Sequence, residues 1–169
     1  MEARIVYSVD YYTDINEDDC LNYQHMFNAE YPTIIKRATL DYCKERLLNT
    51  ENPVRIFTAR SIQSEGSKLI GLIVVRQKDG VEEVPWISMV IHRDYQRKGI
   101  GSTLLEKAKQ YYDTLHGWCT PADGYEREDG SVYPSPLNFY KKHGFKIVKE
   151  NVNDVEGLDL VEIAWRKEN

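Results

Sequence analysis

The stretch Gln96-Arg97-Lys98-Gly99-Ile100-Gly101 lies between a strand-like run that ends near Ile91 and an amphipathic helix that starts near Ile100. A glycine-bearing turn that opens a helix directs several unpaired backbone N–H groups at one point, and the helix dipole adds partial positive charge there. Arg97 and Lys98 add two full positive charges. The stretch therefore predicts a site for a phosphate or pyrophosphate group.

Two well-known phosphate motifs do not fit this turn. A dinucleotide-binding fingerprint needs a third glycine where Leu104 stands, and a P-loop needs a lysine after Gly101, where Ser102 stands. The alternative without a ligand, a tight strand-to-helix connection, stays open because short motifs are weak on their own.

The composition is that of a soluble globular chain. Its 169 residues predict one domain with a sizeable core, and 41% of them are hydrophobic. The net charge of -5 argues against a general nucleic-acid binder and weakly favours a cationic partner. Three widely spaced cysteines fit neither a disulfide framework nor a zinc site, which favours a reducing, cytoplasmic compartment. No signal peptide and no membrane-spanning run is apparent.

Hydrophobic periodicity predicts alternating strands and helices along the chain. We expect strands at 4–9, 54–62, 69–76, 81–92, 117–119, 145–151 and 158–166, with a hairpin turn at Asp79-Gly80. We expect helices at 18–28, at 33–52, from Gly99 to about Leu115, and at 135–143. Pro85 is awkward for a central strand unless it lies at a bulge or an edge.

A second landmark is Phe139-Tyr140-Lys141-Lys142-His143-Gly144-Phe145. Together with the pattern Gln/Arg-x-x-Gly-x-Gly/Ala, filled by Gln96, Gly99 and Gly101, it makes the chain resemble the GCN5-related N-acetyltransferase (GNAT) superfamily. The resemblance is sharp over about 84–148 and only topological over the first half. It implies a single α/β N-acetyltransferase domain over 1–169, with helices around a mixed, mostly antiparallel sheet that splits at the cofactor site.

The resemblance also implies the cofactor, acetyl-CoA, without a metal. Backbone amides from Arg97 to Ser102 would hold its pyrophosphate. The end of the preceding strand would pair with the pantetheine arm and polarise the thioester carbonyl. The implied cofactor-binding residues are Met89, Val90, Ile91, Gln96, Arg97, Lys98, Gly99, Ile100, Gly101 and Ser102, although Met89 to Ile91 would serve equally well as ordinary core residues.

Within the same resemblance, Tyr140 would protonate the departing thiolate, since a phenol of pKa about 10 can give a proton to a thiolate of pKa about 8.5. Packing alone is the other interpretation of Tyr140. The base is less clear, because Pro85 stands where some family members carry a glutamate. Glu83, on the same predicted strand face as Met89, is the candidate, acting through water; a solvated turn is the alternative.

The segment 120–136, rich in Pro, Gly, Asp and Glu, is a variable loop. Tyr133 stands where the family often has an asparagine. Tyr125, Glu126, Glu128 and Tyr133 would shape a substrate pocket, unless the loop is only a mobile surface segment.

The predicted reaction is direct transfer of an acetyl group from acetyl-CoA to a primary amine, with a small cationic amine favoured as acceptor. A protein or peptide amine is one alternative, and a non-catalytic acyl-CoA-binding module is another. A regulator that binds ATP or a dinucleotide at the same turn is a third. We expect neither nucleic acid nor membrane as partner; a homodimer is common in the superfamily.

Overall fold

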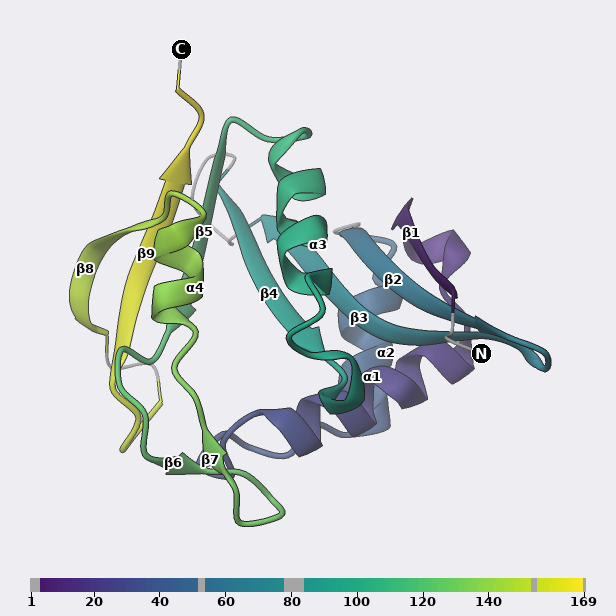
Figure 1. Ribbon diagram of the computed structural model, residues 1–169, viewed down its shortest axis with the longest axis horizontal. Helices are drawn as coiled ribbons and strands as arrows, with labels where there is room; N and C mark the ends of the chain where they lie inside the picture. The colour runs from purple at the N-terminus through teal and green to yellow at the C-terminus, as the bar shows by residue number, and fades with distance from the viewer. Residues whose placement is uncertain (1–3, 52–53, 78–83, 153–154, 169) are drawn as a thin grey trace.

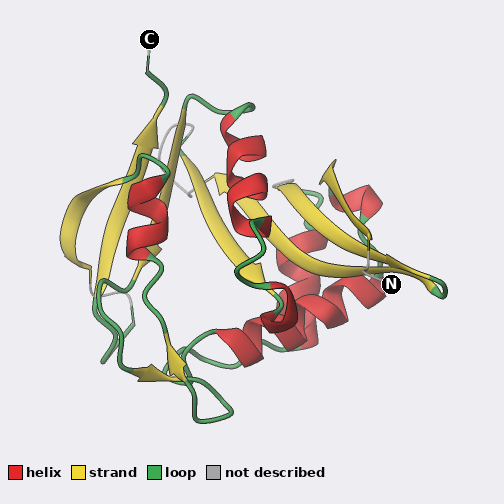
Figure 2. Ribbon diagram, viewed as in Figure 1, coloured by secondary structure: helices red, strands yellow, loops and turns green. Residues whose placement is uncertain are grey.

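The computed structural model describes residues 4–51, 54–77, 84–152 and 155–168, and its centre is a seven-stranded sheet (Figures 1 and 2). The strand order is β1-β2-β3-β4-β5-β9-β8. These strands are β1 (Arg4–Asp10), β2 (Arg55–Gln63), β3 (Gly66–Gln77), β4 (Pro85–Ile91), β5 (Thr114–Cys119), β8 (Lys146–Val152) and β9 (Leu160–Arg166). Every neighbouring pair is antiparallel except β4 and β5, so the sheet is mixed and mostly antiparallel, as predicted.

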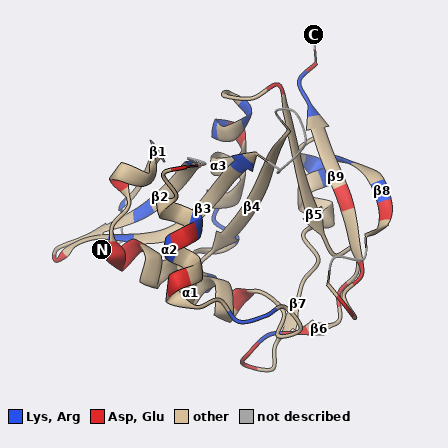
Figure 3. Ribbon diagram, turned by 180° about the vertical axis from the view of Figure 1, so that it is seen from behind, with Lys and Arg blue, Asp and Glu red and all other residues tan. Residues whose placement is uncertain are grey.

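Helices cover both faces of the sheet. Helices α3 (Ile100–Lys109) and α4 (Leu137–Lys142) lie in front of it in Figure 1, whereas α1 (Glu17–Glu30) and α2 (Leu40–Leu48) lie on the face turned to the viewer in Figure 3. Two single 3-10 turns are η1 (Tyr12–Asp14) and η2 (Arg93–Tyr95). This arrangement confirms a single α/β domain with a mixed sheet flanked by helices.

Side chains of β4 alternate between these two faces, as strand geometry requires. Ile87 packs in the core cluster under α3, and Met89 and Ile91 pack against it. Val90 belongs instead to the cluster under α1 and α2. The strand therefore presents different side chains to two separate cores, so residues on both faces of the sheet can line a cavity beside β4.

Strands β4 and β5 separate soon after they meet. They are joined by one registered pair, Trp86 with His116, and diverge beyond it (Figure 1). On the other side of β4, the His92 amide donates a hydrogen bond to the Ile70 carbonyl at 2.8 Å. The pairing of β3 with β4 continues from there without a register shift. Because such bonds alternate along an antiparallel pair, the backbone groups of Met89 and Ile91 point away from β3, into the gap.

Several expected boundaries were wrong. The helix expected at 33–52 is only α2, capped by the Thr39 side chain, which accepts from the Tyr42 amide. Arg37 and Asn28 instead hold the preceding segment as a loop. Helix α3 ends at Lys109, and β5 begins at Thr114, earlier than predicted, because Thr114 onward pairs with β9.

The segment 120–136 contains a small hairpin of β6 (Tyr125–Glu126) and β7 (Val132–Tyr133), which no sequence pattern predicted. Pro85 is tolerated in a central strand because it is the first residue of β4. The predicted turn at Asp79-Gly80 lies outside the described residues. Among the residues that are described, no helix is long and apolar enough to cross a membrane.

Candidate active site

A cavity of about 700 Å³ occupies the gap between β4 and β5. Its walls come from β4, the N-terminal turn of α3, α4, β7 and the C-terminal end of α1. It is lined by most of the residues that the sequence analysis named as candidates for cofactor binding or catalysis. These are Met89, Val90, Ile91, Gln96, Arg97, Gly99, Ile100, Gly101, Ser102 and Tyr140.

The N-terminus of α3 opens directly into this cavity. Its N-cap, Gly99, has φ +81° and supplies no side-chain cap, so the first N–H groups of the helix keep their bonding capacity for a ligand. The positive φ of Gly99 is the backbone conformation that glycine adopts without strain. A Cβ on Gly101 would lie 3.3 Å from the Phe139 ring, so Gly101 is required for the contact between α3 and α4.

The two basic residues of the turn are placed differently. Arg97, which also has a positive φ of 62°, lines the cavity. The Lys98 ammonium lies over the Tyr95 ring, 5.6 Å from its centroid. An anion at the α3 N-terminus would therefore meet Arg97 directly.

The carbonyl groups at the end of β4 already have partners. The Tyr31 hydroxyl donates to the Met89 carbonyl at 2.5 Å, and the Gln96 side-chain amide donates to the Ile91 carbonyl at 2.8 Å. The N–H groups of Met89 and Ile91 point into the same gap, as the register requires. Val90 lines the cavity, but its backbone groups point toward β3.

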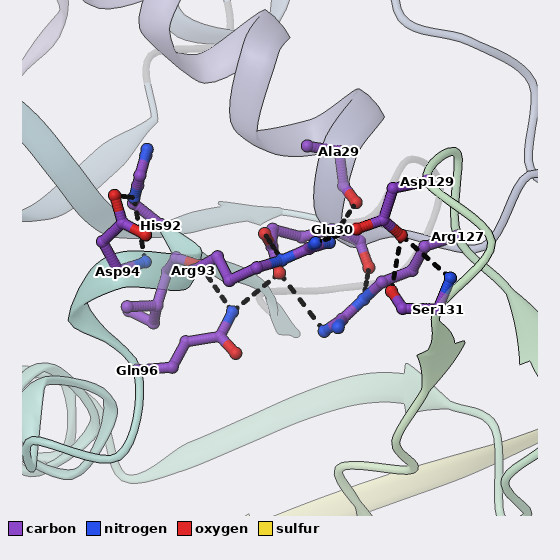
Figure 4. A network of polar contacts seen from close by, with 10 residues as sticks. Ala29, Glu30, His92, Arg93, Asp94, Gln96, Arg127, Asp129 and Ser131 are labelled. Carbon is purple, nitrogen blue, oxygen red and sulfur yellow. Dashed lines mark hydrogen bonds and ion pairs between the residues drawn. The ribbon is translucent and has the colours of Figure 1, made fainter.

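Glu30, at the end of α1, is the centre of a polar network that the sequence did not predict (Figure 4). Its buried carboxylate accepts from Gln96 at 2.8 Å and pairs with Arg93 and Arg127, each at 3.2 Å. The Arg127 guanidinium also donates to the Glu30 carbonyl. The network thus connects the glycine turn at 96–101 and the 120–136 segment to the C-terminal end of α1.

Asp129 extends the network to the tip of the hairpin. It accepts hydrogen bonds from the amide and hydroxyl of Ser131 and pairs with Arg93. These hydrogen bonds from Ser131, together with Arg93, lower the pKa of the Asp129 carboxyl well below its usual range. These contacts join the hairpin tip to Arg93, beside the turn that precedes α3.

Tyr140 lies on α4 and faces the cavity. It is buried, and burial raises its pKa well above that of a free phenol, with Tyr31 and Tyr133 nearby adding to the effect. Its hydroxyl therefore stays protonated at neutral pH and has a proton to give, and the same shift makes it a weaker acid than a free phenol. Tyr133 of the hairpin also lines the cavity, and burial raises its pKa too.

A serine, a histidine and a glutamate are aligned beside the α3 N-terminus. Ser102 Oγ is 3.0 Å from His143 Nε2, and His143 Nδ1 is 3.0 Å from Glu106. The hydrogen bond from His143 lowers the pKa of Glu106. The sequence analysis gave His143 no role of its own; the spacing of Ser102 and Glu106, one turn apart on a helix, was a signal that it did not use.

A free base is not found among the described residues that line the cavity. The carboxylate they contribute is that of Glu30, which is fully engaged. Glu83 lies outside the described residues, so its role stays a prediction. Cys119 is buried, and burial raises its pKa to about 11, so it is held as a thiol and is not a ready nucleophile.

Part of the cavity wall was missed entirely by sequence reasoning. Aromatic rings of Phe27, Tyr31, Trp86 and Trp118 belong to this wall, and Arg46 reaches the cavity from α2. These residues lie far apart in the sequence and meet only through the sheet order. No group of three or more metal-binding side chains occurs in the described part of the chain.

The model of the acetyltransferase (GNAT) domain family matches residues 53–147, which is more than half of the chain. The chain therefore belongs to the GNAT acetyltransferase family, and membership identifies an acetyl-CoA-dependent N-acetyltransferase. None of the curated protein sequences compared with the chain matches it.

Solved structures share the fold at low sequence identity. A variant of the spermidine N-acetyltransferase SpeG from Vibrio cholerae aligns with TM-score 0.64 and 14% identity, covering 95% of this chain and 93% of that one. A GNAT-family acetyltransferase from Streptococcus pneumoniae gives 0.61 and 16%, covering 96% and 99%. A chain of the NatC complex bound to Gag peptide and CoA gives 0.64 and 17%, covering 97% and 99%.

Proposed function

We propose that this protein transfers the acetyl group of acetyl-CoA directly to the primary amine of a small molecule. One observation carries the proposal: a single cavity joins the uncapped N-terminus of α3, the unpaired edge of β4 and the phenol of Tyr140. These are, in order, an anion site, a strand edge for an extended amide-bearing chain, and a proton donor.

The residues present fit coenzyme A. The first turn of α3, from Gly99 to Ser102, would hold the pyrophosphate through backbone N–H groups, with Arg97 adding charge. The N–H groups of Met89 and Ile91 would bond the pantetheine arm and polarise the thioester carbonyl. Gln96 has an indirect role, because its side chain braces the turn against β4 and Glu30.

The chemistry follows from holding the two reactants together. The amine nitrogen attacks the thioester carbon, the carbon–sulfur bond breaks, and Tyr140 gives its proton to the leaving thiolate. The attacking ammonium must first lose a proton, and Glu83 acting through water remains the proposed base. Because no covalent enzyme intermediate is required, the buried thiol of Cys119 takes no part.

A small acceptor is favoured over a protein segment by the hairpin at 120–136. Arg127 and Thr33 bond this segment to α1 and the residues that follow it, beside the cavity. An extended peptide would need that side to be open.

The three cysteines are free and buried, which supports a reducing, cytoplasmic setting. A homodimer remains a prediction, which light scattering would test.

The test is the release of free thiol from acetyl-CoA with a panel of amines, comparing the wild type with Tyr140→Phe. We expect Tyr140→Phe to lower kcat by about 10²-fold or more while cofactor affinity is kept. Tyr111→Phe removes the same hydroxyl from a tyrosine that is 49% exposed and lies outside the cavity, so it is the matched control. An unchanged rate in Tyr140→Phe, or thiol release by neither protein with any amine, would favour the non-catalytic acyl-CoA-binding module.

A further inference from the structure

The cavity has a second region on the α1–α2 face of the sheet, away from the proposed cofactor site. Side chains alternate along β4, so Met89 and Ile91 face α3, whereas Trp86 and Ser88 face α1 and α2. If coenzyme A binds along the α3 side, as proposed above, the acceptor must reach the thioester from this second region. Its lining therefore sets the chemistry of the acceptor.

The first property of this region is an aromatic and aliphatic wall. The rings of Trp86 and Trp118 are 4.8 Å apart, and Phe27 and Tyr31 meet edge to face at 4.7 Å. The aliphatic side chains of Ile35, Val155, Leu158 and Leu160 complete the lining. Such a wall suits a flat or branched apolar group and offers little to a chain of charged amines.

The second property is a partly buried guanidinium without an acidic partner. Arg46 lines the region; it donates to the Tyr42 hydroxyl at 3.0 Å, and its charge lies over the Tyr42 ring. The Tyr23 hydroxyl also interacts with this guanidinium, while Arg46 Nε is buried and makes no hydrogen bond of good geometry within the described residues. No carboxylate in the described ranges forms an ion pair with Arg46. A buried donor of this kind normally has a partner, and a carboxylate fits its fork best.

The third property is the balance of charge around the cavity. Its described lining includes Arg46, Arg97 and Arg127, against the single carboxylate of Glu30. Glu30 already pairs with two arginines and accepts from Gln96. Arg127 is thus compensated, and Arg97 lies at the proposed pyrophosphate site, so Arg46 is the charge left for the acceptor, where it would disfavour a polyamine and attract an anionic group.

We propose that the acceptor is an amine that also carries a carboxylate and an apolar, preferably aromatic, body. The carboxylate would pair with Arg46, and the body would pack between the two tryptophans and the aliphatic wall. Arg46, Tyr31 and Tyr140 line the same cavity, so a small molecule there can contact Arg46 at one end while its amine lies toward Tyr140. A hydrophobic amino acid has all three features, and its reacting amine satisfies the expectation of a cationic group.

The test compares L-phenylalanine with phenethylamine, which lacks only the carboxylate, and with spermidine. In the wild type, kcat/KM should be highest for phenylalanine. In Arg46→Met, kcat/KM for phenylalanine should fall about 10- to 100-fold, mainly through KM, while that for phenethylamine changes little. Arg46→Lys should recover part of the loss, because it keeps the charge but not the planar fork.

Two controls keep the result interpretable. Lys44→Met removes a positive charge from the same helix, where Lys44 pairs with Glu17 outside the cavity, and should leave all three substrates unaffected. Calorimetric titration of each variant with acetyl-CoA shows whether the cofactor site is intact. The inference is overturned if the wild type prefers phenethylamine or spermidine, or if Arg46→Met affects all three amines equally.

A separate binding measurement distinguishes this inference from the proposed reaction. Phenylalanine is titrated calorimetrically into protein already saturated with CoA, where no turnover occurs. Binding to the wild type that Arg46→Met loses would support the inference even if no amine is acetylated, and the proposed reaction alone would then fail. Turnover of spermidine that is independent of Arg46 would support the reaction and overturn the inference.

Discussion

Replacing Glu30 with glutamine should destabilise the fold by removing the charge at the centre of its polar network. The Glu30 and Arg127 side chains are only 6% and 10% exposed, so losing the carboxylate leaves Arg127 buried without its ion-pair partner. Removing one member of a buried pair costs about 3–5 kcal/mol. Arg93 is 39% exposed and keeps Asp129, so we expect the lower end of this range, about 3 kcal/mol.

The assay is urea unfolding followed by tryptophan fluorescence, with Glu17→Gln as the matched control. Glu17 lies on the same helix, and its side chain is 82% exposed, so its ion pair with Lys44 should be worth less than about 1 kcal/mol. In thermal unfolding of the same proteins, Glu30→Gln should lower Tm by about 5–15 °C, as expected for a domain of this size. Equal losses in the two variants would refute the claim that this network holds the turn and the hairpin together.

Three further predictions concern the same elements. Gly101→Val places a branched side chain against Phe139, where even a Cβ lies at 3.3 Å, and should raise KM for acetyl-CoA; an unchanged KM would contradict the assigned packing of α3 on α4. Burial holds the pKa of Tyr140 well above its usual range, so the wild-type rate should show no loss from phenol ionisation up to about pH 10; a fall centred near pH 8 in kcat, absent from Tyr140→Phe, would refute this. Hydrogen bonds from Ser131 and the charge of Arg93 depress the pKa of Asp129, so its stabilisation is present above about pH 4 and is lost as pH falls toward the depressed value; Asp129→Asn should be less stable than the wild type at pH 7 and approach it below about pH 3, as thermal unfolding at each pH would show.

Local patterns in the sequence predicted much of the fold and the position of one half of the site. The glycine turn at 96–101 and the stretch around Tyr140 are continuous in sequence, so their spacing alone places them on α3 and α4. The separation of β4 from β5 was expected from the family resemblance, and the single Trp86–His116 pair agrees with it. The helix expected at 33–52 was too long because Arg37 and Asn28 satisfy the backbone of a loop there.

The acceptor side of the cavity could not be predicted, because its residues come from helices, strands and loops that are far apart in the sequence. Arg46, Trp86 and Trp118 have no common spacing and meet only when α2, β4 and β5 pack together. Glu30 gave no signal either, since a lone glutamate at a helix end resembles any solvated residue. Its partners Arg93 and Arg127 are separated from it by 63 and 97 positions, so only tertiary structure reveals the network.

The central claim is that coenzyme A binds at the α3 N-terminus in the gap between β4 and β5, and calorimetric titration with acetyl-CoA tests it most directly. The critical variant is Gly99→Glu, which puts a negative charge at that N-terminus. Its control is Gly130→Glu, in the hairpin, because the two glycines have φ of +81° and +84° and open space around them, so the backbone strain is matched. We expect saturable binding by the wild type and by Gly130→Glu, and its loss in Gly99→Glu; equal binding by all three proteins, or no binding by the wild type, would contradict the assignment.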